Sequence, residues 1–128
     1  MGKRKRLYSY KLKRKKKNIC YSLIKNLRIS PRKIRRVSKL IIGYNVNKAI
    51  NILEFYKSIK ISSILIKLIL SAINNYKKKN KKNLYIKYII VNSSGMFKRI
   101  KYGPQGKSNI IKKKRSYIKI VIKNGTKN

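Results

Sequence analysis

The chain has 128 residues, enough for one domain, and carries 38 Lys and Arg residues against a single acid, which is a formal net charge of +37. With no His, one acid and one Cys, the sequence can form neither a catalytic acid–base pair nor a metal cluster, so we predict no enzyme, no cofactor and no metal. A single Cys also excludes an internal disulfide, and the chain has no apolar run of about 18 residues that would predict a membrane-spanning helix.

The positive charge requires a partner outside the chain. Almost no cation has an internal counter-charge, and the resulting repulsion falls with salt or with a polyanion nearby. Nucleic acid is the natural polyanion at this charge density, ahead of a membrane surface or a small acidic ligand. Apolar residues make up 42% of the chain and Tyr occurs 10 times, which is too much for a simple disordered tail. We therefore expect a folded core beneath a basic surface.

Residues 1–18, "MGKRKRLYSYKLKRKKKN", form a basic arm, because like charges in a run repel one another and stay extended. We predict that this arm is disordered or lies along RNA phosphates. A solubility tail without specific contacts is the alternative. Residues 19–128 are predicted to form a single domain.

A first helix is predicted in "RISPRKIRRVSKLIIG". Ser30 can cap it, Pro31 suits its first position, and Gly43 follows its end. At about 100° per residue, one side of the helix is apolar. That side has Ile34, Val37, Leu40 and Ile41. The other side has Arg32, Arg35, Arg36 and Lys39. No acid relieves these cations, so we predict nucleic-acid contact, with a solvated basic face as the alternative.

Two further helices follow. "VNKAINILEFY" is predicted to be a short helix capped by Asn47. "ISSILIKLILSAINNYKKKN" is predicted to be the longest helix, capped by Ser62 or Ser63, and its wide apolar arc places it at the centre of the core. The lysine-rich residues that follow, at 77–82, are either solvated or in contact with phosphates.

Two segments near the C-terminus have the composition of strands. They are "LYIKYIIVN" and "SYIKIVIK", and in the second Ile118, Ile120 and Ile122 share one face. Between them, in "MFKRIKYGPQGKSNIIKKKR", Pro104 sets φ and Gly103 and Gly106 accept turn geometry. We therefore predict an extended hairpin over about residues 93–115.

Cationic side chains crowd this hairpin. They are Lys98, Arg99, Lys101, Lys107, Lys112, Lys113, Lys114 and Arg115. A bare two-stranded ribbon is marginal in water, and mutual repulsion weakens it further. We predict that phosphates of packed RNA oppose these cations, and that bases stack on Phe97 or Tyr102. In the free protein we expect a mobile basic loop.

Three blocks of the sequence resemble one family. They are "SPRKIRRVSKLIIGYNVNKAINIL", "ILIKLILSAINN" and "MFKRIKYGPQGKSNIIKKKRSYIKIVI", and their order and spacing resemble the large-subunit ribosomal protein L twenty-two family, from Ile29 to Ile122. The resemblance implies an α+β fold, with three helices packed on a small three-stranded antiparallel sheet and a long protruding β-hairpin. It also implies a structural constituent of the large ribosomal subunit that binds its rRNA and supports its assembly.

The resemblance further implies that the hairpin lines the nascent-peptide exit tunnel. The implied partners are large-subunit rRNA, neighbouring ribosomal proteins and the nascent peptide, with no membrane. The RNA-binding positions that match the family are Arg32, Lys33, Arg35, Arg36, Lys98, Arg99, Lys113, Lys114 and Arg115. The tunnel tip is Tyr102, Gly103, Pro104, Gln105 and Gly106, followed by Lys107. The chain departs from the family at Gly103 and Pro104, where Arg-Ala is usual, at Arg115, where a small hydroxyl residue is usual, and at Tyr117, where His is usual.

The hairpin also distinguishes between two kinds of nucleic-acid-binding protein. A protein that compacts DNA without sequence specificity is the second function considered, although a thin ribbon fits a crevice in folded RNA better than a duplex groove.

The preference for Lys, Ile, Asn and Tyr, whose codons need only A and U, predicts a low-GC genome. We expect a ribosome in an organelle, foremost a plastid, with a mitochondrion or an AT-rich bacterium as the alternatives.

Overall fold

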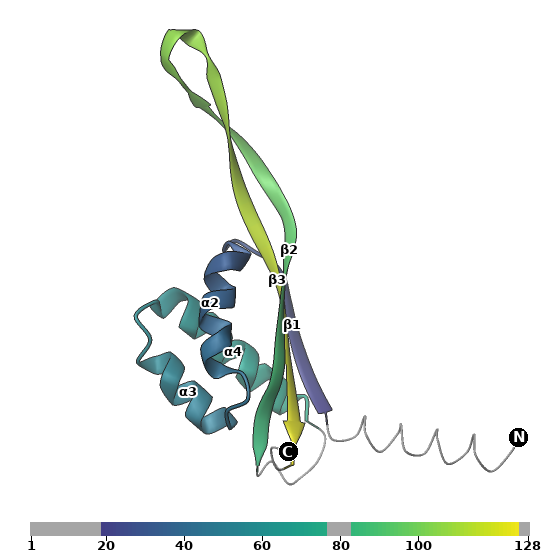
Figure 1. Cartoon of the computed structure of the whole chain (residues 1–128). Helices are drawn as coiled ribbons and strands as arrows, with labels where there is room; N and C mark the ends of the chain where they lie inside the picture. Colours follow the sequence, from purple (N-terminus) through teal and green to yellow (C-terminus); the bar gives the residue numbers. More distant parts are fainter. Residues whose placement is uncertain (1–18, 77–82, 126–128) are drawn as a thin grey trace, which may run out of the picture.

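The computed structural model describes residues 19–76 and 83–125, so the predicted basic arm at 1–18 and the lysine-rich segment at 77–82 lie outside the described residues. The elements in chain order are β1 (Ile19–Leu27), α2 (Pro31–Ile41), α3 (Val46–Glu54), α4 (Ile59–Asn74), β2 (Leu84–Tyr102), the 3₁₀ turn η1 (Pro104–Gly106) and β3 (Ser108–Asn124). The predicted α+β fold, in which three helices pack on a three-stranded antiparallel sheet with a protruding hairpin, is confirmed (Figure 1).

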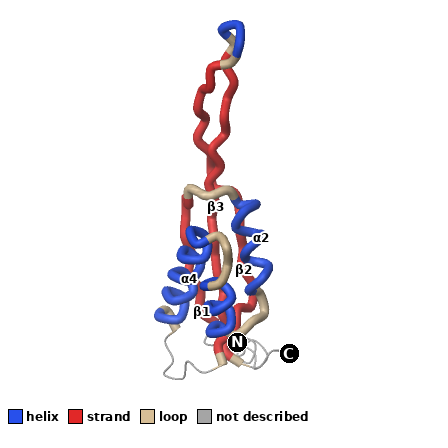
Figure 2. Tube along the Cα trace, turned by 90° about the vertical axis from the view of Figure 1, so that its left-hand side faces the viewer, coloured by secondary structure: helices blue, strands red, loops and turns tan. Residues whose placement is uncertain are grey.

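The central strand is β3, because the sheet order is β1-β3-β2. β1 pairs only with the C-terminal part of β3 and ends where Leu27 faces Ser116. Ser93 of β2 faces Ser116 from the other side, and from there to Tyr102 the strands β2 and β3 continue without a third. This two-stranded part extends about 30 Å at about 3.3 Å per residue, and it is the hairpin that leaves the domain in Figures 1 and 2.

All three helices cover the same face of the sheet (Figures 1 and 2). β3 turns Ile118, Ile120 and Ile122 toward them, as predicted, and these side chains are fully buried. Each contributes about 1.5–3 kcal/mol by leaving water. The helices complete this core with Ile34 and Val37 of α2, Leu53 of α3, and Leu65 and Ile69 of α4.

β1 was not among the predicted elements, and its side chains explain why. Its buried positions are occupied by Cys20 and Ser22, whereas Tyr21 and Leu23 face solvent. A polar residue, Ser22, thus occupies the buried side and large apolar residues occupy the exposed side, so the alternation that identifies a half-buried strand is lost. Ser22 is accommodated because its hydroxyl donates to Oγ of Ser71 in α4, at 3.1 Å.

Two predicted helix starts are wrong. Asn45, not Asn47, is the N-cap of α3, and its Oδ1 accepts a hydrogen bond from the backbone N–H of Asn47 at 3.4 Å. α4 begins at Ile59, so the predicted caps Ser62 and Ser63 lie inside the helix. Ser62 is buried while Ile59 is 79% exposed, and this reversal of the usual polarity conceals the true start.

Candidate nucleic-acid interface

The cationic side of α2 is exposed. Ile34, Val37 and Ile41 pack against the core, and Ser30 occupies the N-cap position but makes no hydrogen bond through its side chain. The exposed cations of this helix are Arg32, Lys33, Arg35, Arg36 and Lys39. No acid lies in the first turn, where the helix dipole disfavours cations such as Arg32. An external anion at this end of α2 would therefore be doubly favoured.

One apolar position of α2 differs from the prediction. Leu40, predicted on the buried side, is 44% exposed, and Ser38 is buried instead. The buried residues Pro31, Ile34, Val37 and Ile41 define an arc around the helix. At about 100° per residue, Leu40 lies about 110° from the centre of this arc and Ser38 only about 50° from it. Ser38 satisfies its hydroxyl by donating to the carbonyl of Ile34 at 2.9 Å. The cationic side of α2 therefore has an apolar residue at its edge.

Arg35 has a structural contact that the other cations of α2 lack among the described residues. Its Nε and Nη2 donate to the backbone carbonyl oxygen of Val91 in β2, at 3.0 and 2.8 Å. Hydrogen bonds from a charged donor are among the stronger ones in proteins. Arg35 therefore joins α2 to the strand that forms one arm of the hairpin, in addition to any role at an RNA surface.

Across the hairpin, one pair of cations is directly opposed. Lys98 stands directly opposite Lys112 in the pairing of β2 with β3. Like charges directly opposite on antiparallel strands are destabilising, by about 0.2–1 kcal/mol a pair. The only acid of the chain, Glu54, is the last residue of α3 and is not part of the hairpin. The exposed hairpin cations are Lys98, Arg99, Lys101, Lys107, Lys112, Lys113 and Lys114. The ribbon consequently has no counter-charge of its own.

Arg115 differs from these cations, because it is half-buried against an aromatic ring. Its guanidinium carbon is 3.7 Å from the ring centroid of Phe97, and that of Arg99 is 5.5 Å from the same centroid. Nε of Arg115 is buried and has no hydrogen-bond partner among the described residues. At this position, where the family resemblance leads one to expect a small hydroxyl residue, the arginine packs at the base of the hairpin.

The hairpin tip is the tight turn that the sequence predicts. The backbone N–H of Gly103 donates to the carbonyl oxygen of Lys107 at 2.7 Å, and η1 fills the space between them. Gly106 has a φ of +70°, in the left-handed region that glycine enters without strain. Gln105 has a φ of 57°, which is uncommon for a residue with a side chain. Tyr102, just before the turn, is 90% exposed.

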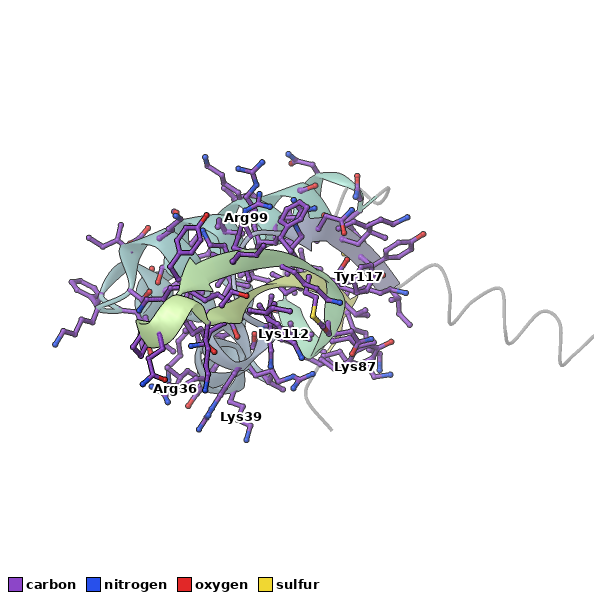
Figure 3. The ribbon with its side chains drawn as sticks, turned by 90° about the horizontal axis from the view of Figure 1, so that it is seen from above. Arg36, Lys39, Lys87, Arg99, Lys112 and Tyr117 are labelled. Carbon is purple, nitrogen blue, oxygen red and sulfur yellow. The ribbon has the colours of Figure 1, made fainter. Side chains whose placement is uncertain are left out.

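The two cationic regions point in different directions. In the view down the hairpin, Arg36 and Lys39 extend from one side of the molecule and Arg99 from the opposite side (Figure 3). The structure therefore brings the cations of α2 together in one cluster, whereas those of the hairpin lie on both faces of the ribbon, because the neighbours Lys98 and Arg99 turn to opposite sides. A single short duplex could not contact both without bending, whereas a folded polyanion with several surfaces could.

Contacts at the base of the hairpin were not predicted from the sequence. The Ser94 hydroxyl donates to Oδ1 of Asn26 at 2.6 Å, where both β1 and β2 depart from regular pairing with β3. Asn26 and Gly95 have positive φ at this point, with values of 56° and 59°. Asn and Gly within a strand pattern are the available signal for such irregularities, because both accept the left-handed region.

Cys20 is a core residue. It is buried, its Sγ lies 3.7 Å from the carbonyl oxygen of Ile122, and burial raises the pKa of its thiol. Within residues 19–76 and 83–125, no group of three or more His, Cys, Asp or Glu side chains could hold a metal ion. None of the helices in this part of the chain is both long and apolar enough to span a bilayer.

Known proteins resemble this chain over most of its length. The family model described as Ribosomal protein L22p/L17e matches residues 22–123. A protein from Flavobacterium johnsoniae named "Large ribosomal subunit protein uL22" is 39% identical over 95% of this chain and 93% of its own length. Proteins of the same name from Bacteroides fragilis (strain YCH46) and Karelsulcia muelleri are 31% and 35% identical, over 100% and 86% of this chain and 97% and 84% of their own lengths.

Proposed function

Because this chain belongs to the ribosomal protein L22p/L17e family and is thus a non-enzymatic, structural constituent of the large ribosomal subunit, we propose that it binds large-subunit rRNA directly, through the hairpin and the cationic side of α2. The two surfaces differ in shape, so their RNA contacts differ as well. The convex side of α2 suits the phosphates of a helical segment, and the thin ribbon suits a crevice between segments.

The observation that carries the proposal is the hairpin without a counter-charge. Lys98 and Lys112 oppose each other, and apolar side chains of the ribbon such as Ile100 and Ile110 are 69% and 61% exposed. Neither ion pairs nor a buried core stabilises this ribbon, because its face-to-face lysines repel and its isoleucines remain in solvent. RNA supplies both missing terms, since phosphates neutralise the lysines and bases cover the apolar side chains.

Assembly and tunnel lining extend the proposal. The hairpin reaches about 30 Å beyond the three-stranded part of the sheet, which is far enough to touch RNA segments that do not contact the domain. By neutralising several segments at once, the ribbon would support assembly of the subunit. Its tip, from Tyr102 to Gly106, is proposed to lie at the wall of the nascent-peptide tunnel and to meet the nascent peptide, with neighbouring ribosomal proteins around the domain.

The compartment is a separate proposal. The chain resides in a ribosome, and its AT-rich codon preference supports a reduced, low-GC genome. The relatives from Flavobacterium, Bacteroides and Karelsulcia are bacterial, which supports the ribosome of an AT-rich bacterium as the location. A plastid ribosome is supported by composition alone.

Salt dependence of RNA binding tests the proposal quantitatively. Each phosphate contact contributes about −0.9 for duplex and about −0.7 for single strands to the slope of log K against log salt. Lys98→Gln with Lys112→Gln should therefore reduce the slope by roughly 1.4–1.8 for binding to large-subunit rRNA. The matched control is Lys57→Gln with Lys60→Gln, which removes the same charge from exposed positions near the turn between α3 and α4 and should leave the slope unchanged.

Sucrose-gradient sedimentation gives the second readout. The wild-type chain should travel with large ribosomal subunits and leave them only at high salt. Equal slopes for the hairpin variant and its control would contradict the hairpin contact, and absence of the chain from large subunits would contradict the proposed role. Competition with duplex DNA addresses the DNA-compacting alternative, because a protein of that class would be displaced from RNA by DNA of equal length.

A further inference from the structure

The sheet has a second face, away from the helices, that no described helix covers (Figures 1 and 2). Directly paired residues of antiparallel strands turn their side chains to the same side, so the register identifies what this face carries. Two rows cross it from β1 through β3 to β2. They are Tyr21–Val121–Tyr88 and Leu23–Lys119–Ile90, which we call the open face.

Burial supports this assignment. Val121 is 3% exposed but is not part of the helix-side core cluster, which places it beneath neighbouring side chains of the open face. Its partners in register, Tyr21 and Tyr88, are 53% and 40% exposed. In the next row Leu23 and Ile90 are 39% and 38% exposed. The open face is therefore a contiguous aromatic and aliphatic surface with a covered floor.

Cations accompany both tyrosines. Nζ of Lys119 lies 4.8 Å from the ring centroid of Tyr21, and Nζ of Lys87 lies 5.7 Å from that of Tyr88. An aromatic ring beside an ammonium group matches the two parts of a nucleotide, because the ring stacks on the base and the ammonium group meets the phosphate. A protein partner would instead have to desolvate both lysines and supply its own carboxylates to compensate them, because the one acid of this chain, Glu54, lies at the end of α3.

Stacking on a tyrosine ring favours unpaired bases over a duplex. In a duplex the next base, at about 3.4 Å, covers each face of a base, so no base face is free for a side chain. Tyr21 and Tyr88 lie on the two strands that flank β3, so their backbones are separated by about 9.6 Å. Each ring can therefore take one base only where the bases are splayed out from a single strand.

The open face also continues into the hairpin. Alternate residues of β3 share a face, so Tyr117, paired with Asn92, follows Lys119 and is followed by Arg115 against Phe97. Seen down the hairpin, Tyr117 lies on the side of the sheet away from the helices (Figure 3). A single strand on the open face would thus pass directly to the cations of the ribbon.

We propose that the open face is a binding platform for a single-stranded segment of RNA, with one splayed base stacked on Tyr21, another on Tyr88, and the intervening phosphate held by Lys119. This inference rests on the proposed function, since it assumes that the chain binds rRNA. It adds a third surface to the hairpin and α2, and it assigns that surface to unpaired bases rather than to the phosphates of a duplex. Tyr21 and Tyr88 are the positions that carry it.

The test measures the affinity of the full chain for two probes by fluorescence anisotropy. The probes are a short oligoadenylate and an RNA duplex of the same length. Tyr21→Leu with Tyr88→Leu keeps apolar bulk but removes the rings, and it should weaken oligoadenylate binding about ten-fold or more while leaving duplex binding unchanged. Tyr21→Phe with Tyr88→Phe keeps the rings and should retain wild-type affinity for both probes, which also separates stacking from the phenolic hydroxyls.

Tyr44 offers a matched control. It is 40% exposed, as Tyr88 is, and Nζ of Lys48 lies 5.1 Å from its ring, but it lies between α2 and α3 and not on the open face. Tyr44→Leu should therefore leave the affinity for both probes unchanged. If the leucine double variant binds oligoadenylate as the wild type does, or loses duplex binding to the same extent, the platform is refuted.

Cross-linking in intact large subunits identifies the occupant. Ultraviolet irradiation should join the peptides containing Tyr21 and Tyr88 to nucleotides of the rRNA. Cross-links from these peptides to another protein, or to residues 1–18 of this chain, would overturn the inference. Failure of the proposed function would give a different result: the wild-type chain itself would bind neither probe with a salt-dependent affinity.

Discussion

Arg35 and Arg36 are neighbours on the cationic helix α2, but we expect Arg35 to stabilise the fold and Arg36 to bind RNA. The two hydrogen bonds of Arg35 to the Val91 carbonyl, at 3.0 and 2.8 Å, join α2 to β2, whereas Arg36 next to it makes no such bond among the described residues. Hydrogen bonds to charged groups contribute about 1.5–3 kcal/mol. Because both bonds share one acceptor near solvent, Arg35→Gln should lower the free energy of unfolding by about 1–2 kcal/mol. For a domain of this size that is a fall in Tm of about 4–8 °C.

Two variants make this a controlled experiment. Arg36→Gln removes the same charge from the same helix, so it measures any stabilisation gained by relieving repulsion, and it should change unfolding by less than about 0.5 kcal/mol. Arg35→Lys keeps the charge but cannot donate through two arms, so it should lie between Arg35→Gln and the wild type. Urea unfolding of the RNA-free protein, followed by circular dichroism, measures all three.

RNA binding should show the opposite order. Arg36→Gln should reduce the salt slope by about 0.7–0.9, and Arg35→Gln should leave it nearly unchanged, since its guanidinium is already engaged. The reasoning is refuted if Arg35→Gln and Arg36→Gln unfold at the same urea concentration, or if Arg35→Lys is as stable as the wild type. Either result would mean that charge alone, and not the contact with Val91, matters at this position.

The remaining predictions concern the centre of the sheet, the hairpin and the thiol. Ser116 is fully buried and its hydroxyl has no partner among the described residues, so Ser116→Ala should raise stability by about 0.5–1 kcal/mol in urea unfolding; a loss would indicate a hidden partner. Backbone amides of residues 101–107 should exchange rapidly with deuterium in RNA-free protein and slowly in large subunits, and slow exchange in both would contradict a ribbon held by RNA. Deletion of residues 103–106 should leave incorporation into large subunits intact on sucrose gradients, because the remaining cations of both arms are retained, and failure to incorporate would show that the tip itself is needed. If the tip lies at the tunnel wall as proposed, the deletion should also alter the width of the tunnel. Burial raises the pKa of the Cys20 thiol, so with rising pH the thiol ionises in the unfolded chain before it ionises in the folded one. The free energy of unfolding should therefore fall as pH rises above the ordinary thiol pKa. The buried thiol should also resist alkylation until the protein unfolds, and prompt alkylation of the native protein would contradict this.

Elements with a strong local signal were predicted correctly from the sequence. α2 combines a proline at its first position with apolar residues at helical spacing, and the isoleucines of β3 alternate along the strand. The hairpin tip was predictable because Pro104 fixes φ and Gly106 accepts the positive φ that the turn requires. In all of these the deciding interactions lie within a few residues of one another.

Elements that depend on distant partners were missed or misplaced. β1 buries Cys20 and Ser22, and only pairing with β3, about a hundred residues away in the chain, makes it a strand. The start of α4 was misplaced because Ser62 is buried by the fold while Ile59 is left exposed. Neither arrangement follows from local propensity, since the packing of other elements decides which side of each segment is covered.

What the sequence alone determined is the nature of the partner. An excess of 37 positive charges cannot be neutralised within the chain, so a polyanion is required whatever the fold. What only the tertiary structure decided is how individual cations are used. Arg35 binds a backbone carbonyl, Arg115 packs on Phe97, and Lys119 stands beside Tyr21, because strand register and helix packing brought these groups within contact distance. Charge is summed over the whole composition, but a contact depends on where folding places two particular atoms.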